Sequence, residues 1–289
     1  MPGVKIQKLA KANGFLVLDL PDAKLSVGPT RLAPKILQDG AEMLARSVTY
    51  SFASFGVQHS GGSAGINAKP DERDDALTAY MEEVAPLVAE GRWLTWPGTG
   101  ATAADLAPLH ASDARMLDDP DLLVRGAVAA AGAMLEGGLD GADIAFVGGG
   151  QLIDTARAVL VDHGAAIVDG DADAACDALF VAGKAGAIDH DAAAAVHAKV
   201  VVPLTPLAVT AKAYAVLRRA EITYVPDFVA LAAPLLAALD PDTGDAVSRV
   251  RELAAALASE GPGAWLAACG LAEAFLQTWQ PSLPFGRPI

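Results

Sequence analysis

Near the middle of the chain, an apolar run leads directly into a cluster of glycines and then into a helical pattern. The run is Ile144–Val147, the glycines are Gly148–Gly150, and apolar residues keep helical spacing over Leu152–Val161. A buried strand, a glycine turn and a helix in that order form the phosphate-binding opening of a dinucleotide-binding fold. Later apolar segments of strand length alternate with helical segments, which indicates a parallel sheet covered on both faces. These segments are residues 165–168, 178–181, 200–203 and 222–225.

The part of the chain before the glycine turn contains a separate set of predicted strands and helices. Strand-like residues are followed by the turn signal Gly28-Pro29, by a long helical pattern and by a loop-like segment rich in glycine and serine. A second helical pattern and a short strand complete the set. The predicted elements are strands at 14–20, 25–27 and 93–95, helices at 33–53 and 71–90, and a loop at 58–69.

The length of 289 residues allows two domains, each with a core of its own. We expect the α/β class. We expect residues 1–120 to form an N-terminal α/β domain and residues 121–243 to form a Rossmann-like parallel-sheet domain. The predicted helices at 244–257 and 264–279 lie in residues 244–289, which are expected to pack back on the first domain. The cleft between the two domains is then the natural place for a small-molecule ligand.

Composition excludes several classes of function. The net charge of −14 and the lack of a basic stripe argue against nucleic acid as a partner. No apolar run approaches the ~20 residues of a membrane span, and no secretory leader is recognisable, so we expect a cytoplasmic protein. Cys176 and Cys269 are too few for a disulfide framework and lack metal-site spacing. The acidic clusters at 71–75 and 118–121 are typical of solvated helix starts, so no metal is expected.

Several short segments occur in an order that resembles one known family. The chain is similar over most of its length to the glutamate, leucine, phenylalanine and valine dehydrogenases. This resemblance implies a two-domain fold, in which the first domain is of a dimerisation type and the second is a trimmed Rossmann-like domain. It also implies NAD or NADP as cofactor, oxidative deamination of amino acids, and a homo-oligomer. The segments are Gly28-Pro29-Thr30-Arg31, Val48-Thr49-Tyr50-Ser51, Gly61-Gly62-Ser63-Ala64-Gly65, Gly148-Gly149-Gly150, Cys176-Asp177, Ala198-Lys199-Val200-Val201 and Val225-Pro226-Asp227-Phe228.

The charged groups that this chemistry needs are missing from the matching positions. In the family, one lysine binds the substrate carboxylate, a second activates water, and an aspartate transfers protons. The matching residues here are Ser51, Ala64 (or Gly65, with the extra residue placed later) and Gly98. We therefore expect altered chemistry on an amino-acid or keto-acid type of ligand. The alternative is a catalytically inactive ligand-binding or regulatory subunit, pairing as a hetero-oligomer with an active homologue, so the sequence leaves enzyme activity open.

The sequence of the predicted cofactor-binding domain also differs from the family pattern. Gly148 and Gly150 are kept, but Ile153 stands where the third small residue of the turn is expected. Asp169 or Asp171 lies where an acid would bind a ribose hydroxyl. The chain then reaches Cys176 without the further helix and strand of the family, and Leu231 replaces an asparagine beside the nicotinamide. NAD or NADP is thus the implied cofactor, bound through a weakened site.

The remaining polar residues near the expected cleft each have two interpretations. Arg31 is either a ligand contact or a structural residue, and Lys184, after a strand end, is either an anion contact or simply solvated. Ser51 and Ser63 are better explained by local backbone hydrogen bonds than as nucleophiles. His59 and Ser60 are adjacent, and their side chains point to opposite sides of an extended segment. The candidate ligand contacts are Arg31, Ser51, His59, Ser63, Asn67, Thr99 and Lys184.

Overall fold

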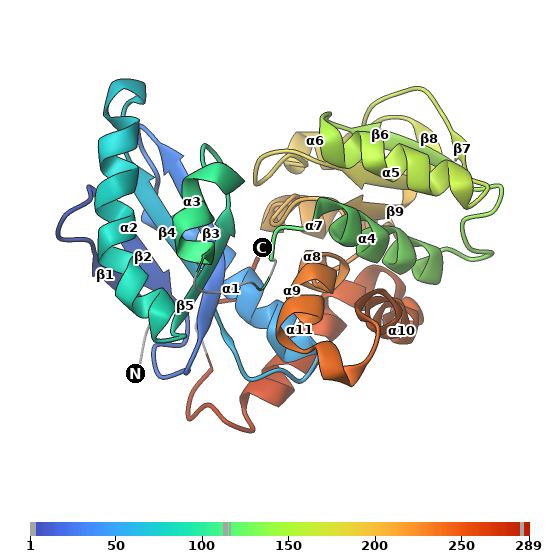
Figure 1. The fold of residues 1–289 in the computed structure, drawn as a ribbon. Helices are drawn as coiled ribbons and strands as arrows, with labels where there is room; N and C mark the ends of the chain where they lie inside the picture. Colours follow the sequence, from blue (N-terminus) through green and yellow to red (C-terminus); the bar gives the residue numbers. More distant parts are fainter. Residues whose placement is uncertain (1–3, 112–114, 116, 284–285) are drawn as a thin grey trace. The chain divides into compact units, whose positions relative to one another are not determined.

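The computed structural model describes residues 4–111, 115, 117–283 and 286–289. The chain divides into two compact units, each formed around its own sheet (Figure 1). The first comprises Met1–Asp118 and Ala272–Pro288, and the second comprises Asp119–Leu271 and Ile289.

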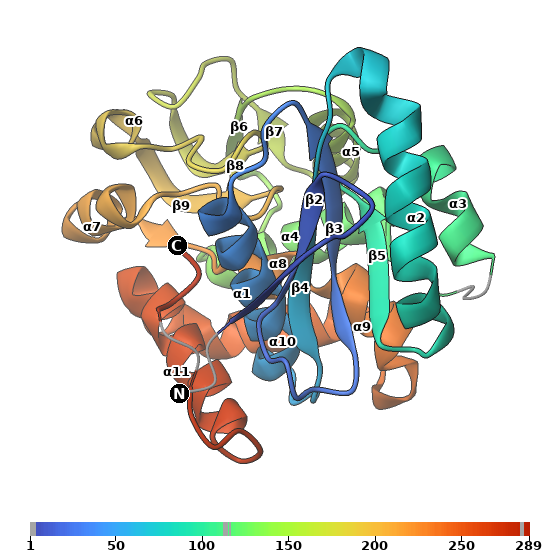
Figure 2. The same ribbon diagram turned by 90° about the vertical axis from the view of Figure 1, so that its left-hand side faces the viewer.

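Sheet A of the first unit is mixed and has five strands in the order β1-β2-β4-β3-β5 (Figure 2). The strand β2 pairs antiparallel with β1 and β4, whereas β3 runs parallel to β4 and β5. The helices α1 and α2 cover opposite faces of this sheet (Figure 1). The elements are β1 (Lys5–Lys8), β2 (Gly14–Leu18), β3 (Ser26–Ala33), α1 (Gln38–Ser54), β4 (Ser60–Asn67), η1 (Pro70–Glu72), α2 (Arg73–Ala89), β5 (Trp93–Pro97) and α3 (Ala103–His110).

The segment predicted as a loop at 58–69 is in fact the buried strand β4. Its glycines are needed because other groups lie very close to the backbone. A Cβ on Gly61 would lie 1.8 Å from the carbonyl oxygen of Ala45 in α1, and one on Gly62 would lie 2.4 Å from the ring of Trp93. The prediction was wrong because glycine and serine favour loops in isolation, whereas here they allow a helix to pack directly on a strand.

The strand β3 also differs from its prediction, because it continues through Gly28-Pro29 to Ala33 instead of ending there. The pairing of β3 with β4 skips both of these residues, while the pairing with β5 continues through them. Proline lacks an N–H, so a strand can accommodate it only where one ladder hydrogen bond is dispensable. This longer strand places Arg31 inside the sheet and delays the start of α1 to Gln38.

The buried polar groups of the first unit form local networks. The hydroxyl groups of Thr30, Tyr80 and Thr95 are joined by contacts of 2.7 Å. The guanidinium of Arg46 pairs with the carboxylate of Asp19 at 2.7 Å, and both side chains are at most 5% exposed. Arg46 also donates to the carbonyl oxygen of Gly286. This last bond ties the end of the chain to the first unit.

Sheet B of the second unit is entirely parallel, with the strand order β10-β9-β8-β6-β7, and the Rossmann-like prediction is confirmed. The strand β7 forms one edge, and residues 168–174, all of them described, connect it to β8 without a helix or a further strand. The elements are α4 (Pro120–Met134), β6 (Asp143–Val147), α5 (Gln151–Asp162), β7 (Ala166–Ile167), β8 (Ala175–Val181), α6 (His190–Ala195), β9 (His197–Pro203), α7 (Ala211–Arg219), β10 (Thr223–Tyr224), α8 (Asp227–Ala230), α9 (Ala233–Leu239), η2 (Pro241–Thr243), α10 (Ala246–Ala258), η3 (Gly261–Gly263) and α11 (Ala264–Leu276).

The C-terminal helices group differently from expectation. Residues 244–271 belong with the second unit, and only 272–288 belong with the first. The reason is the apolar face of α10, where Ala246, Val250, Ala254 and Leu257 are buried as α10 packs on α4. None of the helices in the described ranges is both long and apolar enough to cross a bilayer.

Candidate functional site

The glycine turn lies at the carboxyl edge of sheet B, between β6 and α5. Gly148 has a φ of +99°, and a Cβ there would lie 1.9 Å from the carbonyl oxygen of Ala182. Gly150, with a φ of +90°, is the N-cap of α5, and no described side chain caps the helix. A Cβ on Gly149 or Gly150 would meet nothing within 4 Å. The turn is thus rigid on its sheet side and open on its outer side.

This geometry has an electrostatic consequence. The first backbone N–H groups of α5 lack partners within the helix, and the helix dipole adds partial positive charge at the same end. Such an end accepts a phosphate group directly. Asp169 and Asp171 are exposed and follow β7, on the neighbouring strand. Ile153 is 3% exposed, so its side chain packs inward in the place of the expected small residue.

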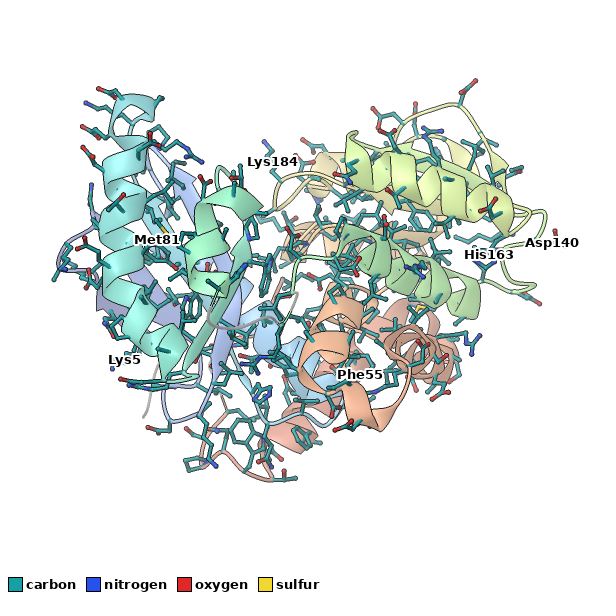
Figure 3. The ribbon with its side chains drawn as sticks, viewed as in Figure 1. Lys5, Phe55, Met81, Asp140, His163 and Lys184 are labelled. Atoms are coloured by element: carbon teal, nitrogen blue, oxygen red, sulfur yellow. The ribbon has the colours of Figure 1, made fainter. Side chains whose placement is uncertain are left out.

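Two more charged residues follow strands of sheet B at this carboxyl edge. Lys184 is exposed in the turn after β8, and Figure 3 shows it at the other end of the unit from Asp140 and His163. Asp227 follows β10 and is only 1% exposed. Carboxyl ends of parallel strands are where open α/β sheets expose their ligand crevice. Both residues are therefore placed on the edge that carries the glycine turn.

Asp227 was not singled out from the sequence as a site residue. Its Oδ2 accepts a 2.7 Å hydrogen bond from the backbone N–H of Leu207, a non-glycine residue with a φ of +57°. Its Oδ1 has no partner among the described residues. Burial raises the pKa of Asp227 to about 6, against the opposing effect of its backbone hydrogen bonds. The signal in the sequence was an aspartate two residues after the Ile222–Val225 strand.

In the first unit, the positions at which the sequence resemblance leads us to expect charged residues are packed against their neighbours. Ser51 is 5% exposed and donates to the carbonyl oxygen of Ser47 within α1. Ala64 belongs to the apolar core cluster under α2. A Cβ on Gly65 would lie 2.6 Å from the Phe15 ring, and one on Gly98 would lie 2.8 Å from Cγ of Arg31. The fold has closed around small, uncharged residues at all of these places.

The predicted ligand contacts of the first unit fall into two groups. Arg31 and Asn67 lie at the carboxyl edge of sheet A, with Thr99 beside them, where the N–H of Leu32 donates to the carbonyl oxygen of Thr99. Ser51 and His59 lie at the opposite end of α1. Gly40, in the first turn of α1, lies beside Arg31, and Ser51 is eleven positions further along the helix, about 16 Å along its axis.

Most of these contacts have local roles. Asn67 Oδ1 accepts from the N–H of Ile36 at 2.6 Å, and the His59 ring lies edge-on to Phe52. The Oγ of Ser63 is fully buried on the α1 side of β4 and makes no hydrogen bond with a described residue. Arg31 is the exception among the charged candidates, because its Nε and Nη2 are buried and also lack a partner in the described ranges.

A hollow of about 500 Å³ lies elsewhere, between α4, α5 and α10. It touches α5 at Val159 and His163, at the end opposite the glycine turn, and includes none of the predicted site residues. Its walls are mostly apolar, although Arg125, Arg251 and His163 also line it. Within the described residues, no cluster of three or more histidine, cysteine or acidic side chains is placed to bind a metal ion.

No protein-family model and no curated protein sequence matches the chain. Solved structures do match it over nearly its whole length. L-tryptophan dehydrogenase from Nostoc punctiforme has a TM-score of 0.74 at 19% identity, covering 96% of each chain. The Leu-bound hetero-hexameric glutamate dehydrogenase from Thermus thermophilus has a TM-score of 0.72 at 18% identity, covering 94% of this chain and 87% of that one. The glutamate dehydrogenase of Plasmodium falciparum has a TM-score of 0.73 at 12% identity, covering 92% and 79%.

These likenesses define the class of fold. The chain has the fold of the amino-acid dehydrogenases, as the order of its sequence segments predicted. At identities below 20%, this similarity concerns the architecture and not the reaction.

Proposed function

We propose that this protein binds NAD or NADP at the glycine turn of the second unit and an amino-acid or keto-acid type of ligand, without performing lysine-assisted oxidative deamination. Cofactor binding is supported chiefly by the start of α5, which has no capping side chain and follows the turn formed by Gly148 and Gly150. Gly148 cannot be replaced without moving Ala182, because a Cβ would overlap its carbonyl oxygen. A turn so constrained and so open on its outer face suits a pyrophosphate.

The residues present fit the phosphate part of the cofactor best. Backbone N–H groups at Gly150 and the first turn of α5 would bind the pyrophosphate, and Asp169 would accept from a ribose hydroxyl. The short connection 168–174 provides less wall for the adenosine than a further helix and strand would. When bound, the cofactor would supply a hydride acceptor or donor.

The absence of the family's charged groups supports the second half of the proposal. Ser51, Ala64 and Gly98 offer no ammonium group to bind or activate a reactant and no carboxylate to transfer a proton. Neighbouring residues would have to reproduce a reacting geometry within a fraction of an ångström. A reaction on this fold must therefore use other groups.

The cofactor half is tested by calorimetric titration of NADH and NADPH into the whole protein and into the Gly148→Ala variant. We expect saturable binding to the wild type and a loss of at least tenfold in affinity for the variant. Gly137→Ala is the matched control, because Gly137 also has a positive φ of +91° but a Cβ there would meet nothing within 4 Å. No binding of either dinucleotide to the wild type, or equal binding to all three proteins, would overturn this half.

A regulatory subunit is the second candidate function, favoured by the neutral residues at all three positions. One structural neighbour is described as a hetero-hexameric glutamate dehydrogenase, so this fold occurs in mixed assemblies. This role is tested by native mass spectrometry of the protein mixed with an active amino-acid dehydrogenase from the same organism. A stable mixed oligomer would support it, and separate homo-oligomers would count against it.

A further inference from the structure

Arg31 presents an unused pair of hydrogen-bond donors in the first unit. The Nε and Nη2 of its guanidinium are both buried, and neither makes a hydrogen bond with a described residue. These two nitrogens form one edge of the guanidinium, with their N–H groups parallel. Such an edge matches the two oxygens of a carboxylate in a bidentate, charge-assisted pair.

Hydrogen bonds fix the backbone on both sides of Arg31. The N–H of Gly98 donates to the carbonyl oxygen of Thr30 at 2.8 Å, and the N–H of Leu32 donates to that of Thr99 at 2.8 Å. Gly98 itself lies against the stem, since a Cβ there would be 2.8 Å from Cγ of Arg31. The absence of a side chain at position 98 is thus what allows Arg31 its present position.

The start of α1 lies on the other side of the guanidinium. The Nη1 of Arg31 is 4.0 Å from the position that a Cβ on Gly40 would occupy, in the first turn of this helix. The N-cap of α1 is Leu37, which is 62% exposed and provides no capping side chain. The helix dipole therefore adds positive character beside a guanidinium that is already unpaired.

An unpaired, partly buried cation is costly to the folded protein. Burial lowers the pKa of Arg31, and within the described ranges no carboxylate forms an ion pair with it. Buried polar groups in proteins usually have a hydrogen-bond partner, so two adjacent unpartnered N–H groups on one cationic side chain indicate a place where an anion can bind. A negatively charged ligand would offset the cost of burying Arg31. Its oxygens would accept hydrogen bonds from the guanidinium, and its charge would neutralise that of the guanidinium.

We propose that the Nε and Nη2 edge of Arg31 binds the carboxylate of a small organic acid at the carboxyl edge of sheet A. The proposal deepens the proposed function by assigning a residue to its acidic ligand, and it does not require the cofactor. A carboxylate is favoured over a phosphate because the site has one guanidinium edge, which suits two coplanar oxygens and a single charge. Gly98, where the sequence resemblance places an aspartate, provides no carboxylate that could neutralise the charge of Arg31.

The test uses the full chain without cofactor and the carboxylates of four 2-oxo acids: pyruvate, 4-methyl-2-oxopentanoate, phenylpyruvate and 2-oxoglutarate. Binding is measured by calorimetry for the wild type, Arg31→Gln, Arg31→Lys and Arg92→Gln. Arg92 is an exposed arginine of the same unit and is the matched control. For at least one acid, we expect Arg31→Gln to weaken binding tenfold or more and Arg92→Gln to leave it unchanged. Arg31→Lys keeps the charge but loses the paired donors, so it should weaken binding by an intermediate factor.

A second readout separates binding from a structural role. Without ligand, Arg31→Gln should have a thermal midpoint equal to or above that of the wild type, because it removes an unpaired buried charge. A lower midpoint with unchanged affinity would assign Arg31 a structural role and overturn the proposal. It would equally be overturned if none of the acids bound in an Arg31-dependent way, or if inorganic phosphate bound more tightly than all four.

The same variants distinguish this proposal from the cofactor proposal. Arg31→Gln should bind NADH as the wild type does, since Arg31 and the glycine turn belong to different units. If the wild type did not bind NADH or NADPH, the cofactor part of the proposed function would be contradicted. The carboxylate site of Arg31 would still be tested by the titrations with 2-oxo acids.

Discussion

Asp227 shows how a single buried carboxylate is maintained in this fold. One of its oxygens fixes the backbone of Leu207, in the segment after β9, and the other has no partner in the described part of the chain. The carboxylate thus stabilises a strained backbone position at the edge that carries the glycine turn. Because the side chain is almost fully buried, its charged form is the costly one.

This burial leads to a prediction about pH. The pKa of Asp227 is raised to about 6, above its value in the unfolded chain, so the folded state binds more protons between about pH 4 and pH 6. Stability from this group is therefore greatest at low pH and falls as the pH rises through 6, by about 3 kcal/mol at most. The Asp227→Asn variant should lack this decrease, because an asparagine oxygen can still accept from Leu207 and does not ionise.

The measurement is urea unfolding of both proteins at pH 4.5 and pH 7. We expect the variant to gain stability relative to the wild type at pH 7, with a smaller difference at pH 4.5. Asn in place of the exposed Asp162 is the control and should not change the pH dependence. If the free energies of unfolding of Asp227→Asn and the wild type differed by the same amount at both pH values, the raised pKa of Asp227 would be contradicted.

Residue-level predictions from the sequence succeeded where a local rule decides the outcome. Ser51 donates to Ser47 in its own helix, which is one of the two interpretations that the sequence offered. The burial of Asp227 and the unpaired Nε and Nη2 of Arg31 could not be predicted from the sequence, because both depend on what surrounds the side chain in three dimensions.

At the scale of elements, the packing of α1 on β4 depends on glycine. A Cβ on Gly61 would lie 1.8 Å from the carbonyl oxygen of Ala45 and 2.6 Å from the backbone nitrogen of Thr49. Both atoms belong to the backbone of α1, so no rotation of a side chain can relieve the overlap. The N–H of Gly61 also donates to Oγ1 of Thr49 at 2.8 Å, which fixes the strand and the helix at this distance.

We predict that Gly61→Ala lowers the free energy of unfolding by about 3 kcal/mol or more, because the helix and the strand must separate. Urea unfolding monitored by circular dichroism gives this value. Gly270→Ala on the exposed side of α11 is the matched control, since a Cβ there would meet nothing within 4 Å. The control should be neutral or stabilising by up to roughly 1 kcal/mol. Equal effects of the two substitutions would show that the close approach at Gly61 is unimportant.

The elements of the second unit could be predicted more fully than those of the first. Apolar runs of strand length alternate with helices there, and each run was found in sheet B because both faces of a parallel strand are buried. In the first unit, β4 was missed and β3 was predicted too short. Glycine and proline carry the contradictory signals of a turn and of a close backbone approach, and only tertiary packing decides between them.

At the scale of the whole molecule, the sequence predicted two units of the α/β class and the parallel sheet of the second unit. It did not predict that α10 would group with the second unit, because an apolar helix face indicates burial without indicating the partner. The buried pair of Arg46 and Asp19, with its bond to Gly286, likewise joins residues that are far apart in the sequence. Such long-range pairs leave no periodic pattern to be recognised.

The central claim is that the dehydrogenase fold persists here without lysine-assisted deamination. It is tested most directly by measuring NADH and NADPH formation at alkaline pH with the whole protein, saturating NAD or NADP, and a panel that includes leucine, valine, phenylalanine, tryptophan and glutamate. An active amino-acid dehydrogenase serves as the positive control. We predict that the reduced cofactor forms no faster than in the absence of protein, because Ser51, Ala64 and Gly98 provide neither ammonium nor carboxylate groups. Turnover of any of these amino acids at a rate ordinary for such enzymes, about 1 s⁻¹ or more, would contradict the account.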